Sequence, residues 1–480
     1  MKYSNALFLN PYFSGSATSA MKFFPPTGLE YVATSAKDCV DTVTLLDLRY
    51  ETDLADPDKL LDFISKEIDI VCVGIGWDRQ LQEIYDFLNR LPADIPLVAG
   101  GYTATEKVEE LFQNCHTLDI VVRGEGEETI REVLQGAPLE SIAGISYRAN
   151  GTVHHNKNRP LPDLESVTAP DRSLRHNKYR LSVYGVDIGN FSFDTVLSAR
   201  GCPYHCKFCT FSLNPLGQKR TYSARNPLSV VDEIAALEAN VILFSDENFS
   251  VNPERSEEIC DLIIARKIKK RFAAQVRLDI AQYPLLLEKM VKAGFKALLI
   301  GIESPHDWIL RQLNKGFDSA AVRKSFAVLR EYSIFYHGYF IYGNIGETEK
   351  EMLSIPDFAR EIGVDSITCL KLRVEKFSPL KKIAQETPGY HVTDKGELYS
   401  DAYSHAALKK IGRKIKLSFY TPKKFMKIFA KFREIKFFSV KEIILTFSAL
   451  PFVYKNFIIR EIKKRRFFDY VKSLFARAHK

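Results

Sequence analysis

The chain has 480 residues, 46% of them apolar and 12% aromatic, which is enough for packed cores and too long for one ordinary domain. The eight cysteines show no regular pairing, which suits a reducing cytoplasm rather than a secreted disulfide scaffold. The longest apolar run, Ile443 to Tyr454, falls short of the roughly 18 to 20 residues of a membrane-spanning helix. Residues 408–480 carry 21 Lys and Arg against 4 Asp and Glu, a balance of +17, so that the rest of the chain sums to −9.

The first 135 residues alternate short apolar runs with amphipathic stretches, which is the pattern of a parallel sheet covered by helices. Five such units predict a doubly wound, Rossmann-like α/β domain. The predicted strands are Ala6–Asn10, Thr42–Leu48, Asp69–Ile75, Pro96–Ala99 and Leu118–Val122, with helices such as Gly28–Lys37 and Gln80–Leu91 between them.

Glycines mark the loops that follow three of these strands. Ligands of open α/β sheets bind outside the carboxyl ends of the strands, and paired glycines let a bulky ligand approach the backbone there. Each loop alone is as well explained by a tight turn. The candidate binding residues are Gly74, Gly76, Gly100, Gly101, Gly124 and Glu125.

A short hairpin and a linker follow the first domain. Asn150-Gly151 predicts a type I′ turn within residues 143–156. Arg159-Pro-Leu-Pro-Asp163 and Ala169-Pro170 then indicate a domain boundary.

A second alternating region begins at Asp194. Its six βα units are too few to close an eight-stranded barrel, and chemistry in barrels of this type collects at the carboxyl ends of the strands. The predicted strands are Thr195–Ala199, Val241–Ser245, Phe272–Arg277, Ala297–Ile302, Phe335–Tyr342 and Ser366–Leu372.

Three cysteines follow the first of these strands at C-x3-C-x2-C spacing: Cys202, Cys206 and Cys209. Three thiolates this close can hold one face of a [4Fe-4S] cluster and leave one iron open. The alternative is zinc, but a closed structural zinc site needs a fourth Cys or His, and no second C-x2-C follows nearby. The spacing therefore favours the iron–sulfur cluster.

The segment from Arg200 to Cys209, with Phe208 directly before the last cysteine, resembles the signature of the radical S-adenosylmethionine (SAM) superfamily. The resemblance implies an open iron that chelates SAM and reduces it to a 5′-deoxyadenosyl radical, inside a partial (β/α)6 barrel. It also implies further SAM contacts at later strand ends. These are Asp246 and Glu247 for the amino group, Arg277 and Glu303 for the ribose or carboxylate, and Ile341 and Gly343 beside the adenine.

The first domain resembles the cobalamin-binding domain that precedes many radical SAM barrels. The matching stretches are Pro25 to Tyr31, Gly100-Gly101 and Arg123 to Glu127. The D-x-H-x-x-G motif of proteins that ligate cobalamin through a histidine is missing. The resemblance therefore implies cobalamin without a protein histidine on its lower face, where Trp77 or Tyr102 could pack.

From about residue 385 the sequence mixes cations with Phe and Ile at helical spacing, in Lys409–Lys416, Lys423–Lys436 and Phe457–Phe475. The first interpretation is a helical cap on the barrel mouth with solvated cations. The second is a helix on an anionic membrane surface. Nucleic acid is the least favoured partner.

These patterns divide the chain into a cobalamin-binding domain (1–140), a hairpin and linker (141–190), a radical SAM partial barrel (191–385) and a basic, mainly helical C-terminal region (386–480). The resemblance implies cobalamin-dependent methylation of an unactivated carbon on a small-molecule or lipid substrate. Flavodoxin or ferredoxin would donate electrons. The alternatives are a radical rearrangement or cyclisation with the same cofactors, and a zinc-binding or electron-carrying module without SAM chemistry. The expected location is the cytoplasm, with a place at the inner face of the membrane left open.

Overall fold

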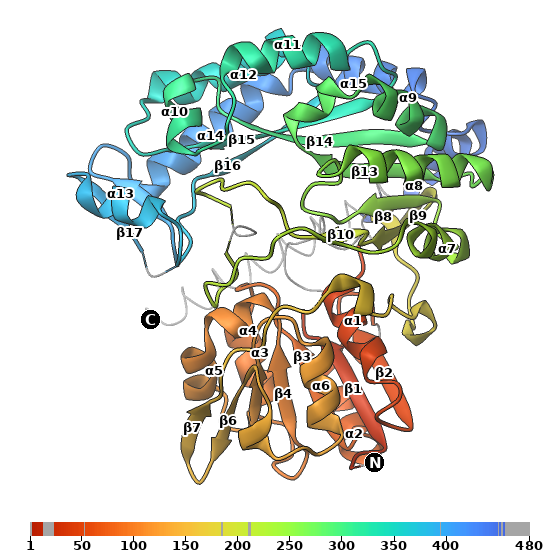
Figure 1. The fold of residues 1–480 in the computed structure, drawn as a ribbon, viewed down its shortest axis with the longest axis vertical. Helices are drawn as coiled ribbons and strands as arrows, with labels where there is room; N and C mark the ends of the chain where they lie inside the picture. The colour runs from red at the N-terminus through yellow and green to blue at the C-terminus, as the bar shows by residue number, and fades with distance from the viewer. Residues whose placement is uncertain are drawn as a thin grey trace, which may run out of the picture.

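Two seven-stranded sheets organise the chain, one in each half, and they lie one above the other in Figure 1. The structure is a computed structural model, and it describes residues 2–12, 24–51, 53–183, 186–209, 213–393, 395–449, 451–452 and 455–456. Short 3-10 turns cover Leu139–Ser141, Leu164–Ser166, Arg172–Leu174 and Leu278–Gln282.

The first sheet contains the five predicted strands, all parallel, in the order β2-β1-β3-β4-β5. Buried apolar residues form one core on each face of this sheet, as expected for a doubly wound domain. Its strands are β1 (Asn5–Asn10), β2 (Thr42–Asp47), β3 (Ile70–Gly74), β4 (Leu97–Gly100) and β5 (Ile120–Val122). Its helices are α1 (Thr27–Ser35), α2 (Pro57–Glu67), α3 (Leu81–Leu88), α4 (Tyr102–Glu106), α5 (Val108–Asn114) and α6 (Glu127–Leu134).

The predicted hairpin is present as β6 (Ile145–Ala149) and β7 (Thr152–His155). Asn150 and Gly151 both have positive φ, of 49° and 76°, as a type I′ turn requires. The hairpin pairs antiparallel with β5 and so extends the first sheet. We propose that the domain boundaries lie at residues 140, 190 and 385, between the first domain, the hairpin and linker, the partial barrel and the C-terminal region.

The second sheet has the order β16-β15-β14-β13-β12-β9-β8. Six strands are parallel, which confirms the partial barrel, and β8 is an antiparallel edge that the sequence did not predict. The first strand of this sheet was predicted at Thr195–Ala199, but β9 begins and ends earlier in the sequence, at Val186 and Val196. The strands are β8 (Arg180–Val183), β9 (Val186–Val196), β12 (Val241–Phe244), β13 (Arg271–Val276), β14 (Phe295–Glu303), β15 (Phe335–Tyr342) and β16 (Ser366–Lys371), with a small ladder of β10 (Ala199–Arg200) and β11 (Ser223–Ala224).

Helices cover the outer face of the second sheet, and its other face turns toward the N-terminal domain (Figure 1). They are α7 (Pro227–Ala236), α8 (Pro253–Ala265), α9 (Pro284–Ala293), α10 (Asp307–Gln312), α11 (Ser319–Leu329) and α12 (Glu349–Ile362). Side-chain caps fix several starts: Asn226, Asn252 and Asp318 accept from backbone N–H groups of the first turn, and Thr348 forms a capping box with Glu351.

The C-terminal region contains α13 (Leu380–Glu386), β17 (Tyr390–Val392), β18 (Leu398–Ser400), α14 (His405–Phe419), α15 (Pro422–Glu434) and a further helical stretch at residues 440–449. The predicted cap on the barrel mouth is wrong for α15. Its Phe432 ring stacks on Phe335 at the start of β15, with 4.8 Å between centroids, and Lys296 at the start of β14 donates to the Ile435 carbonyl at 2.8 Å. The segment therefore crosses the amino ends of the strands, opposite the mouth.

Residues 457–480, which include the predicted Phe457–Phe475 repeat, lie outside the described residues. In the part of the chain that the structure describes, none of the helices has the length and apolarity that crossing a bilayer requires.

Candidate cofactor site

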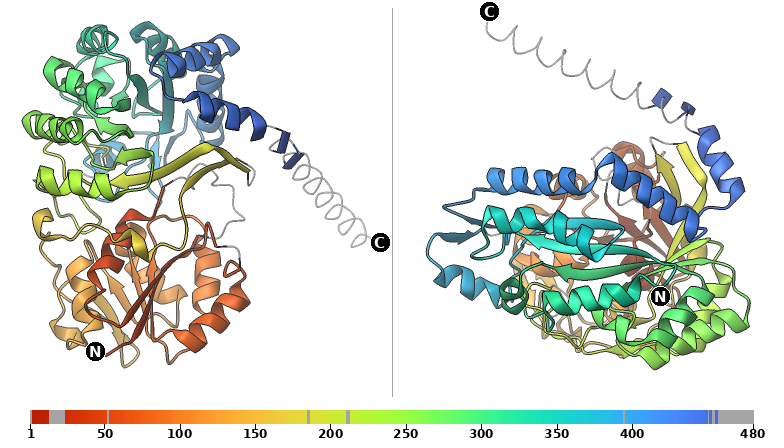
Figure 2. Two further views of the ribbon diagram at one scale, coloured as in Figure 1. Left: turned by 90° about the vertical axis from the view of Figure 1, so that its right-hand side faces the viewer. Right: turned by 90° about the horizontal axis from the view of Figure 1, so that it is seen from above.

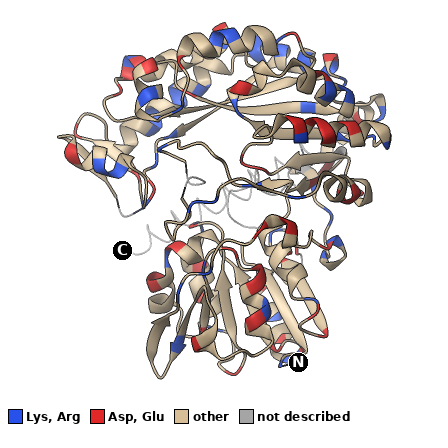
Figure 3. Cartoon of the chain, viewed as in Figure 1, with Lys and Arg blue, Asp and Glu red and all other residues tan. Residues whose placement is uncertain are grey.

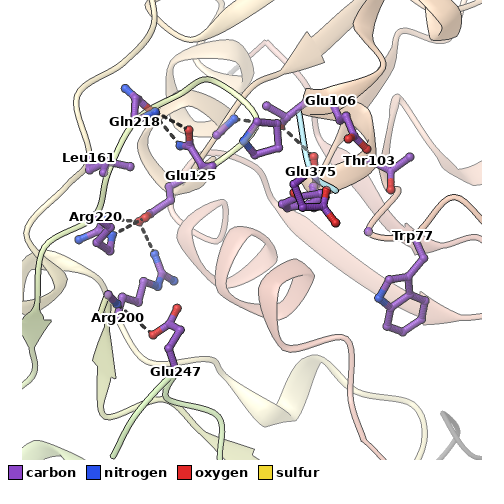
Figure 4. Close-up of a pocket in the computed structure, with 18 of the residues that line it drawn as sticks. Trp77, Thr103, Glu106, Glu125, Leu161, Arg200, Gln218, Arg220, Glu247 and Glu375 are labelled. Carbon is purple, nitrogen blue, oxygen red and sulfur yellow. Dashed lines mark hydrogen bonds and ion pairs between the residues drawn. The ribbon is translucent and has the colours of Figure 1, made fainter. Parts of the chain in front are cut away.

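A cavity of about 520 Å³ lies between the carboxyl edges of the two sheets (Figure 4). The first sheet contributes the loops after β3, β4 and β5, through residues 76–78, 101–103, 105–106 and 124–125. The second half contributes residues 200–201, at the start of the cysteine loop, and residues 214, 215, 218 and 220, which follow it. It also contributes the ends of β12 and β16 through Glu247, Arg373 and Glu375. In both halves the cavity thus lies at the edge where the strand-end rule predicts a ligand.

Three of the predicted glycines line this cavity, and the backbone requires glycine at two of them, Gly101 and Gly124. A Cβ on Gly76 would meet nothing within 4 Å, so this backbone faces open space. Gly101 has φ +103°, and a Cβ there would lie 2.8 Å from the Ile75 carbonyl oxygen. Gly124 has φ +80°. The resulting surface lets a bulky ligand contact the backbone directly.

The other two predicted glycines serve the sheet instead. Gly74 ends β3, and a Cβ there would press on the Leu29 side chain of α1 at 3.1 Å. Gly100 pairs with Gly74 in the parallel ladder, and neither residue lines the cavity.

Glu125 lines the cavity, but its carboxylate is already engaged (Figure 4). It accepts from the Arg200 and Arg220 guanidinium groups, each at 2.6 Å. Arg200 also donates to Glu127 on α6 at 2.6 Å and lies 5.0 Å from the Tyr31 ring centroid. Glu125 therefore joins the two halves of the molecule.

The two aromatic residues considered for the lower face of cobalamin both line the cavity. Trp77 and Tyr102 are 39% and 37% exposed. The Tyr12 hydroxyl fixes the Trp77 backbone by accepting from its N–H at 2.7 Å. Burial raises the pKa of Tyr102, and the nearby Glu375 raises it further, so this phenol stays protonated.

The three cysteines of the loop carry reduced thiol groups at half-buried positions. Contacts from several elements fix the loop backbone. Gly201 N–H donates to Glu247 at 2.9 Å, Lys207 N–H donates to the Leu313 carbonyl at 3.0 Å, and the Asn314 amide donates to the His205 carbonyl at 2.8 Å. Gly201 has φ +91°, and a Cβ there would overlap the Thr221 carbonyl, so the loop requires glycine.

Arg277, at the end of β13, packs against the cysteine loop. Its guanidinium lies 3.8 Å from the Tyr204 ring centroid and 3.9 Å from the Cys206 sulfur, and it donates to the Lys315 carbonyl. Burial raises the pKa of Cys202, and the positive charge of Arg277 opposes that rise. A cation here favours thiolates in the loop.

The two acidic residues after β12 lie in different surroundings. Asp246 is buried and accepts from the Ser198 backbone N–H at 2.7 Å and from its hydroxyl at 2.5 Å. Glu247 lines the cavity and holds the cysteine loop through Gly201. Burial raises the pKa of both carboxyl groups. Asp246 therefore orders the chain before the loop, and Glu247 is the one that faces the cavity.

The remaining predicted SAM contacts lie at the ends of β14 and β15. Glu303 is buried in an ion pair with Lys315, with 3.0 Å between the charged atoms. The Lys315 ammonium lies 5.7 Å from the Phe208 ring centroid. Phe208 packs against the apolar cluster that contains Ile341. Gly343 has φ +74°, and a Cβ there would meet Leu408 of α14 at 3.2 Å.

The sequence reasoning missed several charged residues of the cavity. Arg200 belongs to the cysteine motif, and Arg220 follows the loop. Glu106 lies on the short helix after β4, and Arg373 and Glu375 follow β16. Only Arg373 and Glu375 could have been predicted as cavity residues from the sequence, because they directly follow a predicted strand. Burial raises the pKa of Glu375, and Arg373 opposes that rise.

The residues present fit the implied cofactors. Three thiols on one fixed loop suit an iron–sulfur cluster. In the part of the chain that the structure describes, no three His, Cys, Asp or Glu side chains are arranged to hold a single metal ion. The glycine-lined backbone next to Trp77 and Tyr102 suits a bulky flat ligand such as cobalamin.

Comparisons with known proteins agree. Residues 196–359 match the family model of the radical SAM superfamily, and residues 16–134 match that of the B12 binding domain. An uncharacterized methyltransferase of Pyrococcus horikoshii, PH0819, is 28% identical over 71% of this chain and 74% of its own length. The anaerobic magnesium-protoporphyrin IX monomethyl ester cyclase of Rubrivivax gelatinosus is 27% identical over 75% of this chain and 66% of its own length.

Solved structures share the fold. The radical SAM methyltransferase TsrM from Kitasatospora setae, with cobalamin and a [4Fe-4S] cluster bound, superposes with a TM-score of 0.66 at 16% identity, over 87% of this chain and 89% of that one. The cobalamin-dependent SAM radical enzyme OxsB gives 0.65 at 15% identity, over 89% and 70%. The chain therefore carries a radical SAM domain preceded by a B12-binding domain, and its cofactors are SAM with a [4Fe-4S] cluster, and cobalamin.

Proposed function

We propose that this enzyme methylates an unactivated carbon of an uncharged, largely apolar substrate. The observation that carries the proposal is the cavity that both halves share. The glycine-lined loops of the first sheet and the start of the cysteine loop open onto the same space. A methyl donor and a radical generator held there would reach the same substrate atom.

Bound together, the cofactors supply a 5′-deoxyadenosyl radical that removes a hydrogen atom from carbon and a methyl group that replaces it. The chain's own part is to hold and orient them. Cys202, Cys206 and Cys209 would ligate the cluster, with the Arg277 guanidinium 3.9 Å from the Cys206 sulfur. Glu247 keeps the start of the loop in place through the Gly201 N–H.

The other proposed roles follow from the surroundings of each residue. Glu247 is the carboxylate available for the SAM amino group, because Asp246 is occupied by Ser198. Phe208 and Ile341 form an apolar wall suited to the adenine. Gly76, Gly101 and Gly124 would contact cobalamin, with Trp77 or Tyr102 at its lower face. A flavodoxin or ferredoxin would reduce the cluster.

The face of the second sheet that turns away from the helices supports an uncharged substrate. Its half-buried or exposed residues include Leu299, Tyr339 and Leu370, the last 57% exposed. His337, on the same face, bonds the Ser366 and Thr368 hydroxyls at 2.6 and 3.0 Å. Burial lowers the pKa of His337 to about 4, so this imidazole is neutral at pH 7.

Names of relatives support methylation over other radical chemistry. A hopanoid C-3 methylase of Methylococcus capsulatus is 27% identical over 58% of this chain and 53% of its own length. The cyclase of Rubrivivax gelatinosus supports the second candidate, a ring closure with the same cofactors. The substrate class and the reaction remain our proposal.

Anaerobic turnover of the reconstituted enzyme tests this function. With a reductant and SAM, we expect 5′-deoxyadenosine from the parent and from Cys260→Ala, which removes a thiol on α8. Cys206→Ala should abolish it. With the substrate present, methylation adds one CH2 to the product and yields S-adenosylhomocysteine, whereas cyclisation yields neither. Absence of 5′-deoxyadenosine from an enzyme with full iron content would contradict radical chemistry and favour an electron-carrying module.

We also propose that the protein works at the inner face of the membrane, held by its basic C-terminal region. The charge balance of residues 408–480 supports this placement.

A further inference from the structure

Two C-terminal helices expose large apolar side chains to solvent. On α15 these are Phe425, Met426 and Phe429, which are 58%, 75% and 61% exposed. On the helical residues 440–449, Val440, Ile444 and Phe447 are 75%, 62% and 61% exposed. Single exposed apolar residues are ordinary, but six on two consecutive helices are not.

On α15 the partly buried positions 424, 428, 431 and 432 form the stripe that packs toward the barrel. Phe425 borders this stripe, because it stands seven residues before Phe432 and stacks on Tyr420 with 5.7 Å between ring centroids, while Phe429 and Met426 lie progressively farther round the helix toward solvent. On the last helix, Glu442 and Ala449 are buried, and Val440, Ile444 and Phe447 lie on the opposite side at i, i+4 and i+7. The sequence thus supplies one apolar face to the fold and another to solvent.

Exposed cations border this surface. Lys423, Lys427, Arg433 and Lys441 are all exposed on the same two helices. The two acids are engaged elsewhere: Glu434 pairs with Lys431, and Glu442 pairs with Arg271 at the start of β13. Figure 3 shows Lys and Arg along the C-terminal helices. The surface is therefore both apolar and positively charged.

This charge decides which partner can cover the surface. A second copy of the chain would place lysines against lysines. Residues 457–480 of the same chain carry 8 Lys and Arg against 2 Asp and Glu, so they would be repelled as well. An anionic lipid surface offers hydrocarbon for the phenylalanines and negative charge for the lysines at once.

The exposed apolar surface of the C-terminal helices lies away from the cofactor cavity. The C-terminal helices lie along one side of the second sheet, away from the N-terminal domain (Figure 2). Arg271, Lys296 and Phe335 anchor them at the amino ends of β13, β14 and β15, whereas the cofactor cavity lies at the carboxyl ends of the strands. Contact with a membrane there would leave the cavity open.

We propose that Phe425, Met426, Phe429, Val440, Ile444 and Phe447, bordered by Lys423, Lys427 and Lys441, form the surface that docks on an anionic lipid bilayer. The inference rests on the peripheral membrane placement proposed above and assigns it to this surface. It does not depend on the reaction that the enzyme catalyses.

Co-sedimentation of the full-length holoenzyme with vesicles tests the surface. We expect binding to phosphatidylcholine vesicles that contain phosphatidylglycerol, and much weaker binding to phosphatidylcholine alone or at high salt. Phe425→Ser/Phe447→Ser should lower the partition coefficient at least about tenfold, because two phenylalanines no longer enter the hydrocarbon. Lys423→Glu/Lys427→Glu should do the same for anionic vesicles only. The matched control is Leu285→Ser, at an exposed leucine of α9.

Three results would overturn the proposal. One is no binding of the parent to anionic vesicles. Another is equal binding by the parent and the phenylalanine variant, together with loss of binding when residues 457–480 are removed, which would place the contact in the tail. The third is a concentration-dependent dimer in sedimentation velocity that the phenylalanine variant abolishes. Formation of 5′-deoxyadenosine, measured on the same samples without lipid, should be equal in all variants and separates this test from that of the proposed function.

Discussion

Several carboxyl groups that the sequence suggested as ligand contacts are held by other side chains of the protein. Asp246, Glu303 and Glu125 all stand at strand ends, yet each is held by an internal partner: Ser198, Lys315 and the pair of Arg200 with Arg220. These partners lie 12 to 95 residues away in the sequence. Strand-end position is therefore readable from the sequence, whereas occupancy by a distant partner is not.

Glu347, after β15, leads to a prediction at the same scale. Its carboxyl is buried, one oxygen accepts from the Asn344 backbone and side chain at 2.9 and 3.0 Å, and the other has no partner. Burial raises its pKa from 4.5 to about 7, against the effect of the Asn344 hydrogen bonds. Between these values the folded chain holds a proton that the unfolded chain has lost, so the free energy of unfolding falls as pH rises.

We expect Glu347→Gln to remove that fall. Relative to the parent, the variant should gain up to about 3 kcal/mol between pH 4.5 and 7, following roughly 1.4 kcal/mol per pKa unit. Thermal unfolding of both proteins at pH 5, 6, 7 and 8 measures the difference. A constant difference across this range would mean that Glu347 ionises normally in the fold.

At the scale of elements, the cysteine loop depends on the strand ends around it. Arg277 of β13 touches Tyr204 and Cys206 from one side, and Glu247 after β12 holds Gly201 on the cavity side. The sequence predicted that these elements meet, because parallel strands end at one edge. It assigned Arg277 to the SAM ribose or carboxylate, whereas the structure brings its guanidinium to the loop itself.

Replacement of Arg277 distinguishes these two roles. Arg277→Met removes the ring contact and the charge beside Cys206, so we expect several-fold less iron retained per chain after reconstitution and desalting. Arg323→Met, at an exposed ion pair between α11 and α12, is the control and should retain full iron. Normal iron content with a raised KM for SAM would instead identify Arg277 as a SAM ligand.

The whole fold was predictable where the pattern was regular. Buried parallel strands are continuous apolar runs, so the five parallel strands of the first sheet and five of the six parallel strands of the second could be placed. The sixth, β9, begins at Val186 rather than at the predicted Thr195. β8 could not be placed, because its short sequence Arg-Leu-Ser-Val has no apolar run. The position of α15 at the amino ends of the strands could not be predicted either. An amphipathic pattern shows that a helix has an apolar face, but it does not show which part of the protein that face packs against.

The arrangement of the two halves depends on buried ion pairs at the junction. Arg175 lies between Glu30 of α1 and Asp194 of β9, at 2.5 and 2.6 Å, and all three side chains are nearly inaccessible. Burial raises the pKa of Glu30, and Arg175 is the main influence that lowers it. The cofactor cavity lies between the same two halves, so we expect loss of this contact to weaken cofactor binding as well.

Arg175→Met leaves the buried Glu30 without its cation and Asp194 with only the longer pair to Arg172 at 3.8 Å, and a broken buried pair costs about 3–5 kcal/mol. We expect a lower unfolding midpoint, faster proteolysis in residues 157–180 and weaker cobalamin retention. Lys178→Met removes an exposed pair with Glu238 and should change the unfolding free energy by less than about 1 kcal/mol. Adding Glu30→Gln and Asp194→Asn to Arg175→Met removes the stranded charges and should restore part of the stability. Equal stability of Arg175→Met and Lys178→Met would show that the two halves are held together by other contacts.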